Sequence, residues 1–249
     1  MAGHSQFKNI MYRKGAQDAK RARTFAKIAR EIIVAAKSGL PDPASNPRLR
    51  AALASARAAN MPKDNVERAM KKAIGGEDTS VYEDVRYEGY GPGGVAIIVE
   101  GLTDNRNRTA SEVRSIFNKH GGNLGETGSV GFMFERIGLL SFDAGNFTFD
   151  HMFEQAVEAG AHNVETVGHT LEVTCSMDSF ATVRDYLLEH VGDPLEAKII
   201  WRPHNTLTCT EDTTKTLLKM VDALEENDDV QNVYANFHMS EEMAEKLLG

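Results

Sequence analysis

From residue 81 onward, apolar runs of strand length alternate with segments of helical period, and this alternation restricts the fold more than any other feature. Four strand–helix–strand patterns follow one another. Their members are Val95–Glu100, the helix after Asp104 and Ser129–Glu135; Leu139–Phe142, Phe149–Ala159 and Val164–Val167; Leu171–Cys175, Ser179–His190 and Ala197–Trp201; and Thr206–Cys209, Thr213–Glu226 and Val230–Phe237. Two such patterns build a ferredoxin-like sandwich, so the sequence predicts two sandwiches, and the pattern leaves open whether they are tandem or nested.

The first 76 residues have helical period only. Apolar stripes mark a helix over Ala16–Lys37, a second over Pro47–Asn60 and a third after Pro62. Asn46 and Pro47 suit the N-cap and first position of the second helix. The sequence therefore predicts a three-helix bundle, a polar linker at Glu77–Ser80 and an α/β part beyond it, which is an α+β chain.

The first helix also has a cationic row opposite its apolar stripe. Lys20, Arg23, Lys27 and Arg30 recur at spacings of three and four, and we expect them to face outward. A solvated helix face is the alternative, but such faces normally mix charges of both signs. The predicted nucleic-acid-binding residues are Lys8, Arg13, Lys14, Lys20, Arg23, Lys27 and Arg30.

Charge is divided unevenly along the chain. Residues 1–76 hold 16 Lys and Arg against 5 Asp and Glu, a net charge of +11, whereas the remainder holds 12 against 31, a net charge of −19. Arg48, Arg50, Arg57, Lys63, Arg68, Lys71 and Lys72 extend the basic surface beyond the first helix. A concentrated basic head on an acidic chain favours a polyanionic partner such as nucleic acid, held away from the acidic part.

Other classes of protein are disfavoured. No apolar run approaches the length of about 20 residues that a membrane helix needs, and no secretory signal is evident. Cys175 and Cys209 lie on separate apolar runs, which suits buried thiols rather than a disulfide framework. Without a metal-ligand spacing, a phosphate loop or a nucleophile motif, we expect no metal, no cofactor and no enzymatic reaction.

Two loops of the second part are candidate partner contacts. Gly89, Gly91 and Gly94 fit a dinucleotide fingerprint formally, but the loop leads into a strand, so a tight turn is the better interpretation. Arg106 and Arg108 lie in the first turn of a helix, where the dipole disfavours cations. Either a partner binds there or the protein's own carboxylates pair with them. The candidate partner contacts are Gly91, Pro92, Gly93, Arg106 and Arg108.

Several collinear motifs together resemble one family. They are Met1-Ala2-Gly3-His4-Ser5, Ala16-Gln17-Asp18-Ala19-Lys20-Arg21, Asn46-Pro47-Arg48-Leu49-Arg50, Tyr87-Glu88-Gly89-Tyr90-Gly91-Pro92-Gly93-Gly94, Asp104-Asn105-Arg106-Asn107-Arg108-Thr109 and Gly121-Gly122-Asn123-Leu124-Gly125. In these stretches the chain is similar to the YebC family. It departs from that family at Gln6 and Phe7, where Lys-Trp is common, and at Tyr12, where His is common.

The resemblance implies the nested arrangement: a basic helical bundle (1–77), a split α/β domain (78–135 and 206–249) and an inserted ferredoxin-like domain (136–205). It also implies a non-enzymatic cytoplasmic protein that binds nucleic acid. Two activities are attributed to the family: DNA-binding transcriptional regulation, and translation factors that help ribosomes through consecutive prolines. The expected partners are thus DNA or ribosomal RNA, with the ribosome as the alternative, no membrane and no required oligomer.

Overall fold

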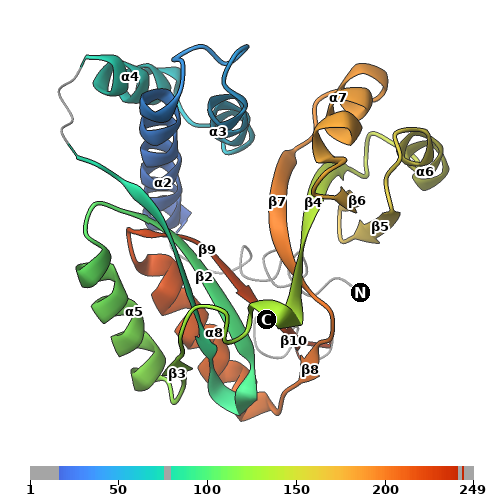
Figure 1. The fold of residues 1–249 in the computed structure, drawn as a ribbon. Coiled ribbons are helices and arrows are strands. Elements are labelled where there is room, and N and C mark those ends of the chain that lie inside the picture. Colours follow the sequence, from blue (N-terminus) through green and yellow to red (C-terminus); the bar gives the residue numbers. More distant parts are fainter. Residues whose placement is uncertain (1–16, 76–79, 241–242, 244–249) are drawn as a thin grey trace. The chain divides into compact units, whose positions relative to one another are not determined.

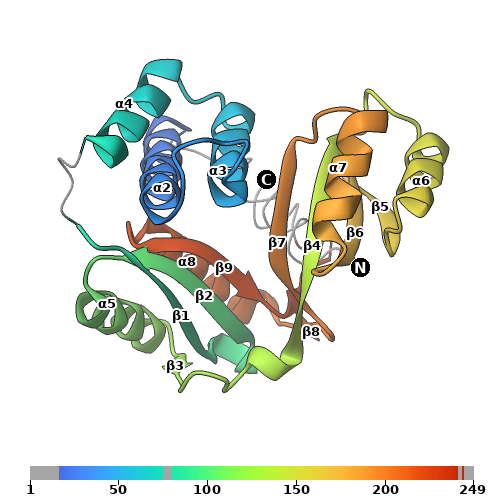
Figure 2. The ribbon, with the colours of Figure 1, turned by 45° about the horizontal axis from the view of Figure 1, so that its top comes forward.

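The structure, a computed structural model, describes residues 17–75, 80–240 and 243, and their side chains from Arg21 onward. Its described part confirms the α+β class, with helices first and two separate four-stranded sheets after them (Figure 1, Figure 2). The chain divides into two compact units. Glu135–Arg202 is called the inserted unit here, and the described residues of Ile10–Phe134 and Pro203–Gly249 the main unit.

Three helices begin the main unit: α2 (Gln17–Ser38), α3 (Pro47–Ala58) and α4 (Lys63–Ile74). Ile32, Ala35 and Leu49 are buried among them, with Phe25 and Ala29 partly buried. Asn46 fixes the predicted start of α3, because its side-chain oxygen accepts from Leu49 N while its Nδ2 donates to Ala35 O of α2. One side chain therefore caps one helix and ties it to another.

The sheet of the main unit has the order β3-β1-β2-β9, and every neighbouring pair in it is antiparallel. The strands are β1 (Glu83–Tyr90), β2 (Ala96–Thr103), β3 (Asn123–Leu124) and β9 (Val230–Ala235). Helices α5 (Arg106–Lys119) and α8 (Glu211–Glu226) lie side by side on this sheet (Figure 2). Phe117 of α5 and Val221 of α8 are fully buried.

The inserted unit has the order β5-β6-β4-β7. Its elements are β4 (Phe134–Asp143), α6 (Phe149–Glu158), β5 (Asn163–Val167), β6 (Thr170–Ser176), α7 (Phe180–His190) and β7 (Glu196–Pro203). Leu140, Met152, Val173 and Leu187 fill its core. Strand order and helix placement are those of the ferredoxin-like sandwich that two of the sequence patterns predict.

The two sheets share one neighbour order when β2 is matched to β4, β3 to β5, β1 to β6 and β9 to β7. The order along the chain differs between the two units. In the inserted unit β6 leads directly into α7, whereas the corresponding strand of the main unit, β1, comes first and forms an antiparallel hairpin with β2. In the chain β1 is therefore separated from α8 by β2, α5, β3, the inserted unit and β8 (Leu207–Thr208).

One strand prediction is wrong, and a second strand pairs elsewhere than expected. Ser129–Glu135 is not one strand: Gly131–Met133 forms a 3₁₀ turn and β4 begins at Phe134. The backbone N–H groups of Val130 and Gly131 donate to the buried Glu88 carboxylate, so they are not available to a ladder. The strand predicted at Thr206–Cys209 is present as β8, but it pairs in parallel with β10 (Phe237–His238) and adds no strand to the main sheet.

Candidate nucleic-acid interface

The predicted cationic row lies on and before α2. Lys8, Arg13 and Lys14 fall outside the described residues, and Lys20 lies on the described helix without a described side chain. Arg23, Lys27 and Arg30 can be placed. All three are turned toward the end of α8 and the segment that follows it.

Each of these three side chains makes a contact far along the chain. Arg23 pairs with Glu226 at 3.0 Å, and Lys27 donates to the Glu225 carbonyl at 2.7 Å. Arg30 reaches the Asp229 carboxylate at 2.9 Å and the Asp228 carbonyl at 2.6 Å. The expectation that the row faces outward is therefore wrong at these positions, where the cations hold the bundle to the α/β part of the main unit.

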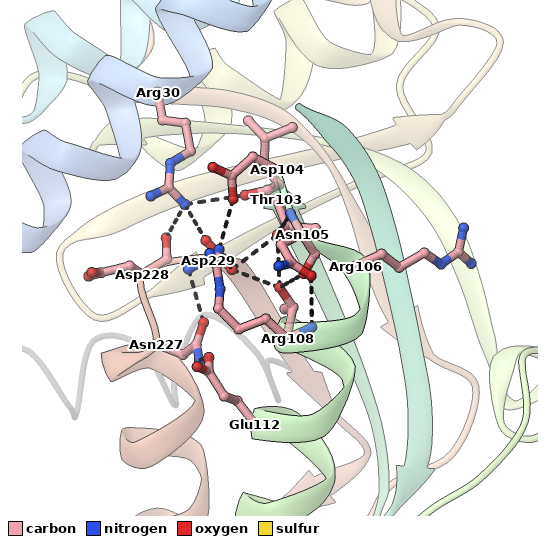
Figure 3. A network of polar contacts seen from close by, with 12 residues as sticks. Arg30, Thr103, Asp104, Asn105, Arg106, Arg108, Glu112, Asn227, Asp228 and Asp229 are labelled. Atoms are coloured by element: carbon pink, nitrogen blue, oxygen red, sulfur yellow. Dashed lines mark hydrogen bonds and ion pairs between the residues drawn. The ribbon is translucent and has the colours of Figure 1, made fainter. Parts of the chain in front are cut away.

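Asp229 is the centre of this contact (Figure 3). Its Oδ1 accepts from Arg30, and its Oδ2 accepts from Arg108, Thr103 Oγ1 and Thr109 Oγ1 at 2.6, 3.1 and 2.7 Å. The Asp229 carbonyl also accepts from Leu102 N at 2.7 Å. One carboxylate thus joins α2, the end of β2, the start of α5 and the start of β9.

Burial by itself raises the pKa of Asp229, but the hydrogen bonds from Arg108, Thr109 and Thr103 outweigh it and hold the pKa below its ordinary value. The side chain is only 6 % exposed. A buried carboxylate with two guanidinium partners and two hydroxyl donors is fully satisfied, so this network stabilises the joint rather than offering a vacant anion site.

Arg106 and Arg108 pair with the protein's own carboxylates, which was the second of the two alternatives. Arg108 contacts Asp104 as well as Asp229, both within 2.9 Å. Arg106 makes a weak contact with Glu83, 3.7 Å long, and its side chain is 65 % exposed. Of the two arginines, only Arg106 presents most of its guanidinium to solvent in the described structure.

The outer faces of α3 and α4 carry a second group of cations. Arg57, Lys63, Arg68, Lys71 and Lys72 are all exposed. Lys63 pairs with Glu67 of the next turn, whereas Arg57, Arg68 and Lys71 have no ion pair in the part of the chain that the structure describes. Arg68 and Lys71 are three residues apart on α4 and share one face.

The glycine loop is a tight turn, as predicted. Gly93 and Gly94 have φ of 71° and 76°, and Gly91 N donates to Val95 O at 2.8 Å. Gly91 is buried, with a Cβ there reaching 2.7 Å from Ile97 Cδ1, so it cannot itself meet a partner. Of the three candidate contacts in this loop, Pro92 is half-buried and Gly93 is exposed.

A second loop packs on the first through glycines. A Cβ on Gly122 would lie 2.6 Å from Tyr90 O, and one on Gly89 would lie 2.5 Å from Asn123 O. Glu88 holds the continuation of this loop. Burial raises the pKa of the Glu88 carboxyl. Hydrogen bonds from the backbone N–H groups of Val130, Gly128 and Gly131 lower it by more, so the pKa lies below its ordinary value.

The described residues give little support for a metal site, a reactive thiol or a membrane-spanning helix. No group of three or more His, Cys, Asp and Glu there could hold a metal ion. Cys175 and Cys209 are buried and unpaired, and burial raises the pKa of both thiols, which disfavours the reactive thiolate. In the described segments no helix has both the length and the apolar character to cross a membrane.

Sequence reasoning missed Asp229, Thr103 and Thr109. Asp229 lies 120 residues from Thr109 in the chain, and no spacing in the sequence brings the two together. The one available signal was the conflict of Arg106 and Arg108 with the helix dipole, which indicated either a partner or the protein's own carboxylates and identified no residue.

Comparison with known proteins agrees with this architecture. Residues 5–76 match the model of the TACO1/YebC protein N-terminal domain, and residues 82–237 match that of the TACO1/YebC second and third domain. Among solved structures, a conserved hypothetical protein, Aq1575 from Aquifex aeolicus, is 44 % identical with a TM-score of 0.82. The match covers 90 % of this chain and 93 % of that one.

Proposed function

Because the chain belongs to the TACO1/YebC family, we propose that it is a non-enzymatic regulator of gene expression that binds nucleic acid through its helical bundle. The family model matched over residues 82–237 is named for the regulation of transcription, which makes DNA the first candidate target. The protein acts in the cytoplasm, as a chain that needs no oligomer.

The segregation of charge supports this proposal most directly. A net charge of +11 in residues 1–76 stands beside −19 in the rest, so only the bundle attracts a polyanion. The acidic remainder is repelled by phosphate and orients the bundle toward it. Such binding falls steeply with salt, because each phosphate contact releases counterions.

Two groups of cations take part in the proposed contact. Arg57, Arg68 and Lys71 are exposed and unpaired within the described residues, so they are available without any rearrangement. The row of Lys8, Arg13, Lys14, Lys20, Arg23, Lys27 and Arg30 completes the basic region. Its last three members, Arg23, Lys27 and Arg30, hold α8 and Asp229, so their replacement lowers stability and does not report on binding alone.

A ribosome-associated translation factor is the second candidate, and it has a specific argument. Helices α3 and α4 carry several Arg and Lys but a single amide side chain, Asn65, so they lack the larger group of Asn, Gln and Arg that reads base edges in a duplex. Phosphate and shape recognition suits structured RNA. The half-buried Pro92 and the exposed Gly93 and Arg106 of the main unit would then supply additional contacts.

The experiment that separates the targets is sedimentation of cell lysate on a sucrose gradient, with and without RNase, beside binding to promoter and random duplexes. A transcription regulator should favour its promoter by about 10³-fold or more. RNase-sensitive co-migration with ribosomes, lost in the Arg57→Ala, Arg68→Ala, Lys71→Ala variant, would instead support the translation candidate. A protein that binds neither duplex nor ribosome would overturn the proposal.

A further inference from the structure

Helix α6 of the inserted unit exposes a line of large apolar side chains. Phe149, Phe153 and Val157 are 43 %, 47 % and 57 % exposed, and the two rings stack with centroids 6.0 Å apart. Their spacing of four places them along one flank of the helix, over a length of about 12 Å. This line is called the α6 stripe below.

The α6 stripe is not required by the core of the inserted unit. Met152 and Ala156 are the residues of α6 that the core buries. Helix α7 contacts the last turn of α6, where Tyr186 donates to Glu158 at 2.6 Å, and the three apolar side chains of the stripe stay exposed. Contiguous apolar groups of this size on a soluble protein mark an interaction site more often than scattered ones do.

The surroundings of the α6 stripe are strongly acidic. The inserted unit holds 12 Asp and Glu against 4 Lys and Arg, and α6 has Asp150, Glu154 and Glu158 but no Lys or Arg. All four cations of the unit are engaged elsewhere. Arg184, Lys198 and Arg202 pair with carboxylates, and Arg136 lies over the Trp201 ring.

We propose that the α6 stripe binds a basic amphipathic helix of a partner protein. An apolar face of two or more turns would pack on Phe149, Phe153 and Val157, while Lys and Arg beside it would meet Asp150 and Glu154. Nucleic acid is repelled by these carboxylates. A second copy of the chain is disfavoured, because a two-fold contact would bring the same carboxylates together.

The test uses the full chain and two labelled synthetic helices of the same apolar face, one flanked by Lys and the other by Glu, followed by fluorescence anisotropy. The Lys helix should bind and the Glu helix should not. Phe153→Ser with Val157→Ser should weaken binding at least about tenfold, since both side chains lose apolar burial. Leu195→Ser, which changes an equally exposed apolar residue of the same unit, is the matched control and should bind like the parent.

A second variant reverses the charge beside the α6 stripe and keeps its apolar side chains, so its effect does not depend on lost apolar burial. Asp150→Lys with Glu154→Lys should transfer the preference to the Glu helix. Equal binding of the Lys helix by the parent and the serine variant, or an unchanged preference after the exchange, would overturn the proposal. Concentration-dependent dimerisation of the parent that the serine variant abolishes would overturn it too, in favour of self-association. None of these outcomes depends on whether the bundle binds nucleic acid.

Discussion

Arg30 of the helical bundle donates to the carboxylate of Asp229 at 2.9 Å, across 199 positions of the chain. The same carboxylate accepts from Arg108 of α5, so two guanidinium groups from different parts of the main unit share one buried acid. The bundle is therefore held to the sheet by a network of ion pairs and hydrogen bonds centred on the Asp229 carboxylate.

Removing this acid should destabilise the main unit. Asp229→Ala leaves Arg30 without its carboxylate, and the loss of one partner of a buried pair costs about 3 kcal/mol of unfolding free energy. Urea denaturation followed by circular dichroism measures this loss. Trp201, the one tryptophan, lies in the inserted unit, so its fluorescence transition is an internal control that should move much less.

A double-mutant cycle tests the pair itself. Asp229→Ala and Arg30→Met should be less than additive, with a coupling energy of about 1 kcal/mol or more. Additivity within about 0.5 kcal/mol would show that the two side chains act independently, which contradicts a joint centred on their contact.

Acid should weaken the same joint. Because the folded-state pKa of Asp229 lies below its unfolded value of about 3.9, its contribution is complete above that value and is lost as the pH falls through the folded pKa. Thermal melting between pH 6 and pH 2.5 should show a smaller acid loss in Asp229→Asn than in the parent. Identical pH profiles would exclude this carboxylate as a source of acid sensitivity.

Gly89→Ala should disturb the contact between the two glycine loops. Its Cβ would lie 2.5 Å from Asn123 O, and backbone cannot yield as a flexible side chain can, so we expect a loss of about 1–3 kcal/mol. Gly145→Ala, whose nearest neighbour at 3.2 Å is an Asp143 side-chain oxygen, is the control and should change stability little. If Gly89→Ala were as stable as the parent, the contact between β1 and β3 could widen without a loss of stability, which would contradict this expectation.

Much of the fold follows from local sequence signals, because they are short-range. Asn46 with Pro47 marks the start of α3, and apolar periodicity locates α6 and α7 with their flanking strands. The strand prediction at Ser129–Glu135 was wrong because this segment forms a turn there. The turn is held by a hydrogen bond from Val130 N to the Glu88 carboxylate, 42 residues away in the chain. The apolar pattern of the sequence does not report this distant hydrogen bond, which replaces strand pairing.

The candidate site was less predictable than the fold. The alternation of cations and apolar residues on α2 correctly located its buried side, but the opposite side meets Glu226 and Asp229 rather than only solvent. A helix face can be basic because a partner within the same chain is acidic. Sequence period reports which residues share a face and not what that face contacts.

The central claim, that the basic bundle contacts nucleic acid, is tested most directly by the salt dependence of binding. Fluorescence anisotropy with the full chain would compare a labelled duplex and a ribosomal RNA fragment at several salt concentrations, for the parent, for Arg57→Ala, Arg68→Ala, Lys71→Ala, and for a control. The control, Arg114→Ala, Lys119→Ala, Lys219→Ala, removes three exposed cations outside the bundle. We expect the bundle variant to bind more weakly, with the log–log slope on duplex reduced by about 0.9 for each lost phosphate contact, and the control to match the parent. Equal slopes for all three proteins would contradict the claim.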